Sequence, residues 1–67
     1  MSRAIHNEQE AYDLGYANPA ADLGRWSWGH LVAINAARCG QLDYQFQAPR
    51  NTSYNRDDYD PITFERK

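Results

Sequence analysis

The hydrophobic and polar positions of this chain follow a helical period in its first half and an alternating period in its second half. The clearest helical pattern runs from residue 27 to residue 39, where Ser27 can cap the start and Gly40 can close the end. Four apolar side chains of this stretch fall on one stripe: Trp28, Leu31, Val32 and Cys39. We therefore predict a helix over 27–39 at the centre of the core.

A second helical pattern precedes it, over residues 7–16. Asn7 and Glu10 have the spacing of a capping box, and Glu8 adds negative charge to the first turn, which the helix dipole favours. Gly15 is placed to end this helix. The stretch 19–23 that follows is predicted as either a short turn or a plain loop.

After Gly40, the apolar residues recur at every second position instead of at helical spacing. Alternate residues from 42 to 48 share one apolar face: Leu42, Tyr44, Phe46 and Ala48. A shorter alternation occupies residues 61–66, and the two stretches can pair as a strand or short hairpin on the helix. The sequence thus predicts an α+β fold in one small domain, 1–67, with a helical scaffold at 1–40 and an extended strand or arm at 41–67.

The stretch from Pro49 to Pro61 has neither period. It is polar, with three aspartates and two tyrosines. A structureless loop of this length is uncommon inside a compact domain and is usually functional or disordered. Either this part is a polar loop or extended C-terminal arm that docks on a partner, or the hairpin prediction is wrong.

The size and net charge of the chain limit the classes of function that it can have. The chain has 67 residues, a net charge of −2 and one cysteine, so it is one domain without an internal disulfide. An acidic chain is poorly suited to non-specific binding of phosphate backbones. The sequence shows no apolar stretch of membrane-spanning length and no apolar signal core, which predicts no membrane contact and a cytoplasmic location, the host cytoplasm if a phage encodes the chain.

Signatures of catalysis, cofactors and metals are missing from the sequence, and we predict no residue in any of those roles. His30 and Cys39 are the best pair for a nucleophile and base, but nine helical positions place them roughly 13 Å apart. The aspartates near Asn55 lack the glycine and distal glutamate of a calcium loop. They are expected to form a solvated acidic turn or to engage a basic surface.

Aromatic and charged residues of the second half form a candidate interface. Tyrosine and arginine dominate the energetics of protein interfaces, and this part of the chain is rich in both. Tyr54 and Tyr59 have no obvious core face in the sequence pattern, which supports a role in contact. We predict these partner-binding residues: Tyr44, Phe46, Arg50, Tyr54, Arg56, Asp57, Asp58, Tyr59 and Asp60.

The first half resembles the ribosome modulation factor group of small bacterial and phage-type proteins. The resemblance rests on the run from Ala11 to Tyr16, and on Trp26 followed by Gly29, His30 and Ala33. That group pairs two helices, binds ribosomal RNA and promotes ribosome dimerisation. This chain departs from the pattern in its acidity, its short connection and its C-terminal third, and His30 stands where the group has tryptophan.

These observations predict a non-enzymatic accessory or inhibitor protein that binds a macromolecular protein partner, for example a phage- or mobile-element-type inhibitor of host machinery. Such a partner could itself be a nucleic-acid-binding complex. Two alternatives stay open: a ribosome- or RNA-binding protein like the group above, and a small structural or adaptor subunit of an assembly such as a virion. Association of the chain with itself also stays open.

Overall fold

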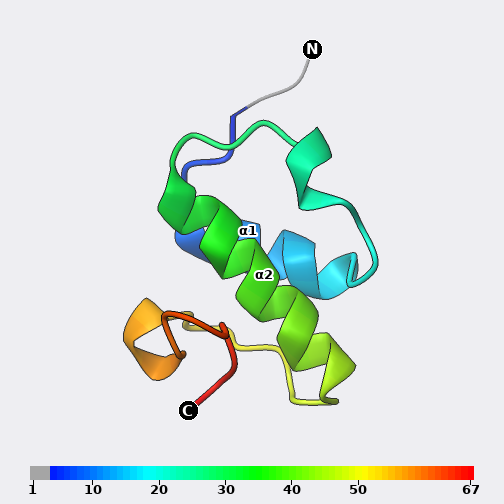
Figure 1. The fold of residues 1–67 in the computed structure, drawn as a ribbon, viewed down its shortest axis with the longest axis vertical. Helices are drawn as coiled ribbons and strands as arrows, with labels where there is room; N and C mark the ends of the chain where they lie inside the picture. Colours follow the sequence, from blue (N-terminus) through cyan, green and yellow to red (C-terminus); the bar gives the residue numbers. More distant parts are fainter. Residues whose placement is uncertain (1–3) are drawn as a thin grey trace.

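The computed structural model describes residues 4–67, and within them the fold is helical (Figure 1). Two α-helices, α1 (Glu8–Ala17) and α2 (Leu31–Gln45), cross one another. A short 3₁₀ turn, η1 (Leu23–Arg25), lies in the connection between them, and a second, η2 (Arg56–Asp58), follows α2. Within the described residues, no strand forms, and the only strand-like pairings are isolated bridges. The predicted α+β fold is therefore wrong, and the domain is a compact pair of helices.

The first helix confirms the prediction to within one residue. The Asn7 side chain accepts hydrogen bonds from the backbone N–H groups of Gln9 and Glu10, which satisfies two donors that the first turn leaves free. Gly15, expected to end the helix, instead lies inside it and is buried. The helix ends at Ala17, and the backbone N–H of its C-cap, Asn18, donates to the carbonyls of Leu14 and Gly15.

The second helix differs from its prediction at both ends. It starts at Leu31, where Nδ1 of His30 accepts a hydrogen bond from the backbone N–H of Ala33, so His30 rather than Ser27 is the cap. It passes through Gly40 and continues to Gln45, which removes the predicted strand at 42–48. The physical reason is Asp43: the strand pattern placed it with the solvent-facing residues, but only the helical continuation buries it against α1.

Small residues let the two helix backbones approach closely at their crossing. A Cβ atom built on Gly15 would lie 1.9 Å from the carbonyl oxygen of Ala37, and one on Gly40 would lie 2.2 Å from the carbonyl oxygen of Tyr12. The fully buried alanines Ala33, Ala36 and Ala37 occupy the same side of α2. At the crossing, α2 thus buries its smallest residues, whereas Leu31, which was expected in the buried apolar stripe, is 79% exposed.

The connection between the helices is held by the N-terminal segment. Ile5 pairs with Trp28 through a parallel bridge, in which the Ile5 N–H donates to Ser27 and the Gly29 N–H donates to Ile5. The indole Nε1 of Trp28 donates to the carbonyl of Leu23 at 2.6 Å. The region predicted as a turn or loop at 19–23 is mostly loop, with the 3₁₀ turn η1 displaced to its end.

The C-terminal segment (residues 49–67) turns back beside the helix pair without forming the predicted strand at 61–66 (Figure 1). The only strand-like backbone pairing within this segment is an isolated antiparallel bridge between Tyr59 and Arg66. The segment is held by side chains instead, and Tyr59, which sequence reasoning left without a core face, is 2% exposed. The expected boundary between a 1–40 scaffold and a 41–67 arm falls inside α2.

Neither helix in the described part of the chain has the length and apolar character needed to cross a membrane. The predicted cytoplasmic location goes further than this and stays a prediction.

Candidate functional site

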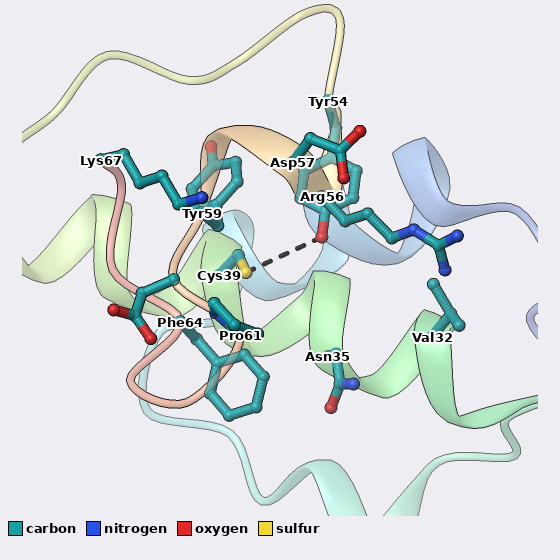
Figure 2. Close-up of a pocket in the computed structure, with 11 residues that line it drawn as sticks. Val32, Asn35, Cys39, Tyr54, Arg56, Asp57, Tyr59, Pro61, Phe64 and Lys67 are labelled. Atoms are coloured by element: carbon teal, nitrogen blue, oxygen red, sulfur yellow. Dashed lines mark hydrogen bonds between the residues drawn. The ribbon is translucent and has the colours of Figure 1, made fainter.

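A pocket of about 330 Å³ lies where the C-terminal segment crosses α2 (Figure 2). One wall comes from α2, through Val32, Asn35 and Cys39, and the opposite wall comes from the segment that contains η2. The remaining lining residues follow one another closely along that segment: Tyr54, Arg56, Asp57, Tyr59, Asp60, Pro61, Phe64 and Lys67. We call this hollow the tyrosine pocket.

The floor of the tyrosine pocket is apolar and its polar atoms are hydrogen-bonded within the chain. The Tyr54 hydroxyl donates to Sγ of Cys39 at 3.8 Å, the contact drawn in Figure 2. Burial raises the pKa of the Cys39 thiol from 9.0 to about 11, and burial together with the neighbouring thiol raises the pKa of Tyr54. Both groups are therefore protonated at neutral pH, and the thiol is a weak nucleophile.

Charged side chains of both signs surround the mouth of the pocket. Arg56 and Asp57 are exposed on η2, and Lys67 approaches Tyr59 from the end of the chain (Figure 2). The backbone N–H groups of Ile62 and Thr63 donate to Asp60 and lower the pKa of its carboxyl, which is ionised at neutral pH. The rim thus offers cations and anions beside an apolar floor, the arrangement common where one apolar side chain of a partner inserts.

Phe64 is the strained residue of the pocket. It has a φ of 63°, the left-handed region that a bulky residue seldom adopts. Its ring packs against the core, and the Arg38 guanidinium lies 5.7 Å from the ring centroid. Backbone strain of this kind concentrates at binding and switch sites.

A buried carboxylate fixes the wall of the pocket. Asp43 is 1% exposed, and its Oδ2 accepts hydrogen bonds from the hydroxyls of Tyr12 at 2.6 Å and Tyr59 at 2.7 Å. The Arg66 guanidinium completes the group with an ion pair to the same oxygen at 2.7 Å. Because α1, α2 and the C-terminal segment each contribute to this cluster, it ties the pocket wall to the helix pair.

The electrostatics of the cluster favour neutral tyrosines beside an ion pair. Burial, followed by the hydrogen bond to Asp43, raises the pKa of Tyr12, and burial also raises that of Tyr59. Burial opposes the charge of Arg66, but its hydrogen bonds to Asp43 and Tyr59 outweigh that effect and raise its pKa. The Arg66 guanidinium also donates to the carbonyl of Pro49 at 3.0 Å, so one side chain secures both ends of the segment.

The structure divides the predicted partner-binding residues among several places. Five of them line the tyrosine pocket: Tyr54, Arg56, Asp57, Tyr59 and Asp60. Tyr44 and Phe46 lie at the end of α2 and are 53% and 60% exposed. Arg50 forms an ion pair with Asp13 of α1 at 2.7 Å, and the exposed Asp58 accepts a hydrogen bond from the Lys67 N–H through its carbonyl. Their role in binding stays a prediction.

Sequence reasoning missed the residues that complete the pocket from the helix side. Val32, Asn35 and Cys39 were assigned to a helix but not to a site, although their spacing of three and four residues places them on one face. Asp43 was also missed. Its signal was present, since an acidic residue at helical spacing from Ala36 and Gly40 continues their stripe.

The two histidines lie at the start of α2, apart from this pocket. His30 accepts from Ala33 through Nδ1, and its Nε2 lies 2.7 Å from the carbonyl of His6, so this nitrogen carries the proton and donates. The ring therefore serves to join the N-terminal segment to the helix. Within residues 4–67, no three side chains of His, Cys, Asp or Glu gather in a geometry that could hold a metal ion.

Comparison with models of protein families, with curated proteins and with solved structures found no match to this chain. The resemblance to the ribosome modulation factor group therefore stays a prediction. Of the residues on which it rests, Ala11, Tyr12 and Ala33 have no exposed surface, and Gly15 sits in the helix crossing. Those residues pack the two helices together in this chain, so a similarity at these positions indicates a similar fold before it indicates a shared function.

Proposed function

We propose that this protein is a non-enzymatic accessory module that binds a protein partner through the tyrosine pocket. The observation that carries the proposal is the pocket itself, an apolar floor of Cys39, Tyr54 and Phe64 inside a rim of opposite charges. A partner would insert one apolar side chain and pair its own charges with Arg56 and Asp57. Interface anchors of this kind are surrounded by polar contacts that exclude water.

The chemistry of the floor supports binding rather than reaction. The thiol of Cys39 is 2% exposed and protonated at neutral pH, and its nearest polar contact is a tyrosine hydroxyl rather than a general base. His30 caps the start of α2, and Cys39 lies nine positions later, roughly 13 Å along the helix axis. This separation is too large for His30 to accept the proton of the Cys39 thiol.

Site-specific photo-crosslinking in the source cells tests this proposal. A photoreactive residue at Asn35, which is exposed and lines the pocket, is expected to give a discrete protein adduct, whereas the same residue at Arg25, which is exposed on η1 and does not line the pocket, is not. Excess wild-type chain should suppress the adduct, and excess Asn35→Trp chain, whose indole fills the pocket mouth, should not. Equal adducts from both positions, or equal competition by Asn35→Trp, would contradict the proposal.

The ribosome- or RNA-binding alternative keeps one observation in its favour. The run from Ala11 to Tyr16 lies on α1 and Ala33 lies on α2, and these two helices pack directly together, although Trp26, Gly29 and His30 precede α2. Sedimentation of a cell lysate through sucrose at low salt separates the two proposals. Co-migration with ribosomal particles would support this alternative, and absence from those fractions would eliminate it.

A further inference from the structure

Both histidines of the chain lie where the N-terminal segment (residues 4–7) meets the start of α2, a place that we call the histidine joint. Their ring centroids are 6.1 Å apart. A Cβ atom built on Gly29 would lie 2.0 Å from Nδ1 of His6, so the His6 ring packs directly on the backbone that precedes α2. Histidine is the side chain that ordinarily changes charge between about pH 5 and pH 8. A change of charge in this range is therefore concentrated at the joint.

One imidazole ring holds the two sides of the histidine joint together. Nδ1 of His30 accepts from the backbone N–H of Ala33 at 3.3 Å, and Nε2 of the same ring donates to the carbonyl of His6 at 2.7 Å. The Ala33 N–H also lies 3.1 Å from the carbonyl of His30, so two acceptors share it. Only the neutral ring with its proton on Nε2 makes both side-chain contacts, because an imidazolium has no acceptor.

A second proton on His30 would act against both contacts. The new Nδ1–H would point at the Ala33 N–H, donor against donor, and the ring would have to turn away. Because the ring is rigid, turning it also withdraws Nε2 from the carbonyl of His6. The imidazolium would in addition place a positive charge at the N-terminus of α2, where the helix dipole disfavours cations.

The charges around His30 do not hold that proton in place. No carboxylate among residues 4–67 forms an ion pair with His30. The first turn of α2 has no acidic residue, whereas α1 has Glu8 and Glu10 in its first turn. The open groove that His30 lines also contains Glu8 and, from η2, Arg56, whose charges oppose one another. His6 lines a smaller hollow with Glu10, and when protonated it adds a positive charge beside His30.

We propose that the histidine joint is an acid-sensitive switch, in which protonation of His30 uncaps α2 and loosens the N-terminal segment in one step. At neutral pH, the segment is held by the His30 ring and by the backbone pairing of Ile5 with Ser27 and Gly29. In mild acid the tie through the ring is lost and only the pairing of Ile5 remains.

Opening of the segment would change the surface of the molecule. Ile5 is only 8% exposed in the closed form and belongs to the hydrophobic core, with Trp28 packed against that core. When the segment lifts, the Ile5 side chain loses its cover, so the switch converts a fall in pH into new apolar surface. The switch is independent of the partner proposed for the tyrosine pocket, because it needs no ligand.

Hydrogen exchange of the full chain at about pH 5 and about pH 7.5, followed by NMR and expressed as protection factors, tests the switch. In wild type, protection of the Ala33, Ile5 and Gly29 amides should fall about fivefold in acid, the usual effect of losing a helix cap. Their N–H groups are the donors at the cap and in the backbone pairing of Ile5. The amide of Phe46, at the other end of α2, should change little.

Two variants identify the group that responds. His30→Asn keeps a side-chain acceptor at the cap but takes up no proton, so its protection factors should be equal at the two pH values. His6→Gln keeps the main-chain carbonyl that His30 contacts, so it should respond as wild type does. A wild-type chain with equal protection at both pH values would overturn the proposal. So would a response that persists in His30→Asn or disappears in His6→Gln, or a fall at Ala33 that leaves Ile5 and Gly29 protected.

Discussion

At the scale of single residues, Cys39 links the pocket floor to the stability of the whole chain. The folded state holds the thiol proton more tightly than the unfolded chain does, with a pKa of about 11 against 9.0. The resulting stabilisation is fully present below pH 9 and is lost as the pH rises toward 11. Its size is about 2–3 kcal/mol in the free energy of unfolding, from the two-unit difference in pKa.

We therefore predict that the difference in the free energy of unfolding between wild type and Cys39→Ala becomes smaller as the pH rises. The variant loses packing and is less stable at pH 7, by about 1–2 kcal/mol for the removed sulfur. It has no thiol to titrate, so its stability should fall less between pH 8 and pH 10.5, and the two proteins should converge. Urea unfolding at a series of pH values measures this, and parallel curves for the two proteins would show that the thiol does not titrate as described.

At the scale of elements, the crossing of α1 and α2 depends on the absence of two side chains. Replacing glycine by alanine in an exposed helix usually stabilises it by about 1 kcal/mol. We predict the opposite for Gly15→Ala and Gly40→Ala, a loss of about 2–4 kcal/mol, because each new methyl group would meet backbone atoms of the other helix. The helices would have to separate and would lose the alanine contacts around the crossing.

Thermal and urea unfolding of the two variants test this prediction, with Gly24→Ala as the control. A Cβ on Gly24 would meet no backbone of another element: its nearest atom is Oδ1 of Asp22 at 3.3 Å, an exposed side chain that caps η1 and needs to shift by only a few tenths of an ångström. Its effect should therefore stay within about 0.5 kcal/mol, as for most surface substitutions. If Gly15→Ala were as stable as Gly24→Ala, the close approach of the backbones would be refuted.

The same crossing explains which elements the sequence could predict. The first helix was predictable because its signals are local: a side-chain cap at Asn7 and acidic residues in the first turn. The second helix was placed from its large apolar residues, whereas α2 buries its smallest ones, Ala33, Ala36, Ala37 and Gly40. An alternating pattern over seven residues fits a strand, and only the tertiary partners of Asp43 decide for a helix.

The candidate site was partly predictable for a related reason. Tyr54, Arg56 and Asp57 stood out by composition, in a segment without periodicity. The opposite wall of the tyrosine pocket comes from α2, and the long-range contacts that bring the two together leave no local pattern. Tyr59 shows the difference most clearly, because only its hydrogen bond to a carboxylate 16 positions earlier places it in the core.

At the scale of the whole molecule, the C-terminal segment and the helix pair are bound together by polar contacts to buried groups. The backbone N–H of Asn51 donates to the Tyr12 hydroxyl at 2.9 Å, and the Tyr54 N–H donates to the side chain of Gln9 at 2.6 Å. Arg66 neutralises Asp43, which is otherwise a carboxylate out of reach of water. The segment is thus part of the folded core in the free chain, so the surface that we propose for binding is preformed.

The substitution Arg66→Met tests how far the stability of the chain depends on the ion pair between Arg66 and Asp43. With the guanidinium removed, Asp43 keeps two hydroxyl donors but no counter-charge, and we expect a loss of about 2–3 kcal/mol in the free energy of unfolding. Arg56→Met on the exposed pocket rim is the control and should change stability little. Adding Asp43→Asn to Arg66→Met should recover part of the loss, because the pair is then removed rather than broken.

Hydrogen exchange read residue by residue distinguishes a cooperative unit from an attached arm. In the wild-type chain, the amides of Asn51 and Tyr54 should exchange as slowly as those in the middle of α2, because the hydroxyl and amide that they contact are fixed on α1. In Arg66→Met, protection of the segment and of the helices should fall together. Rapid exchange of the segment in wild type, with both helices still protected, would instead show an arm that folds only on a partner, and the tyrosine pocket would then form only upon binding.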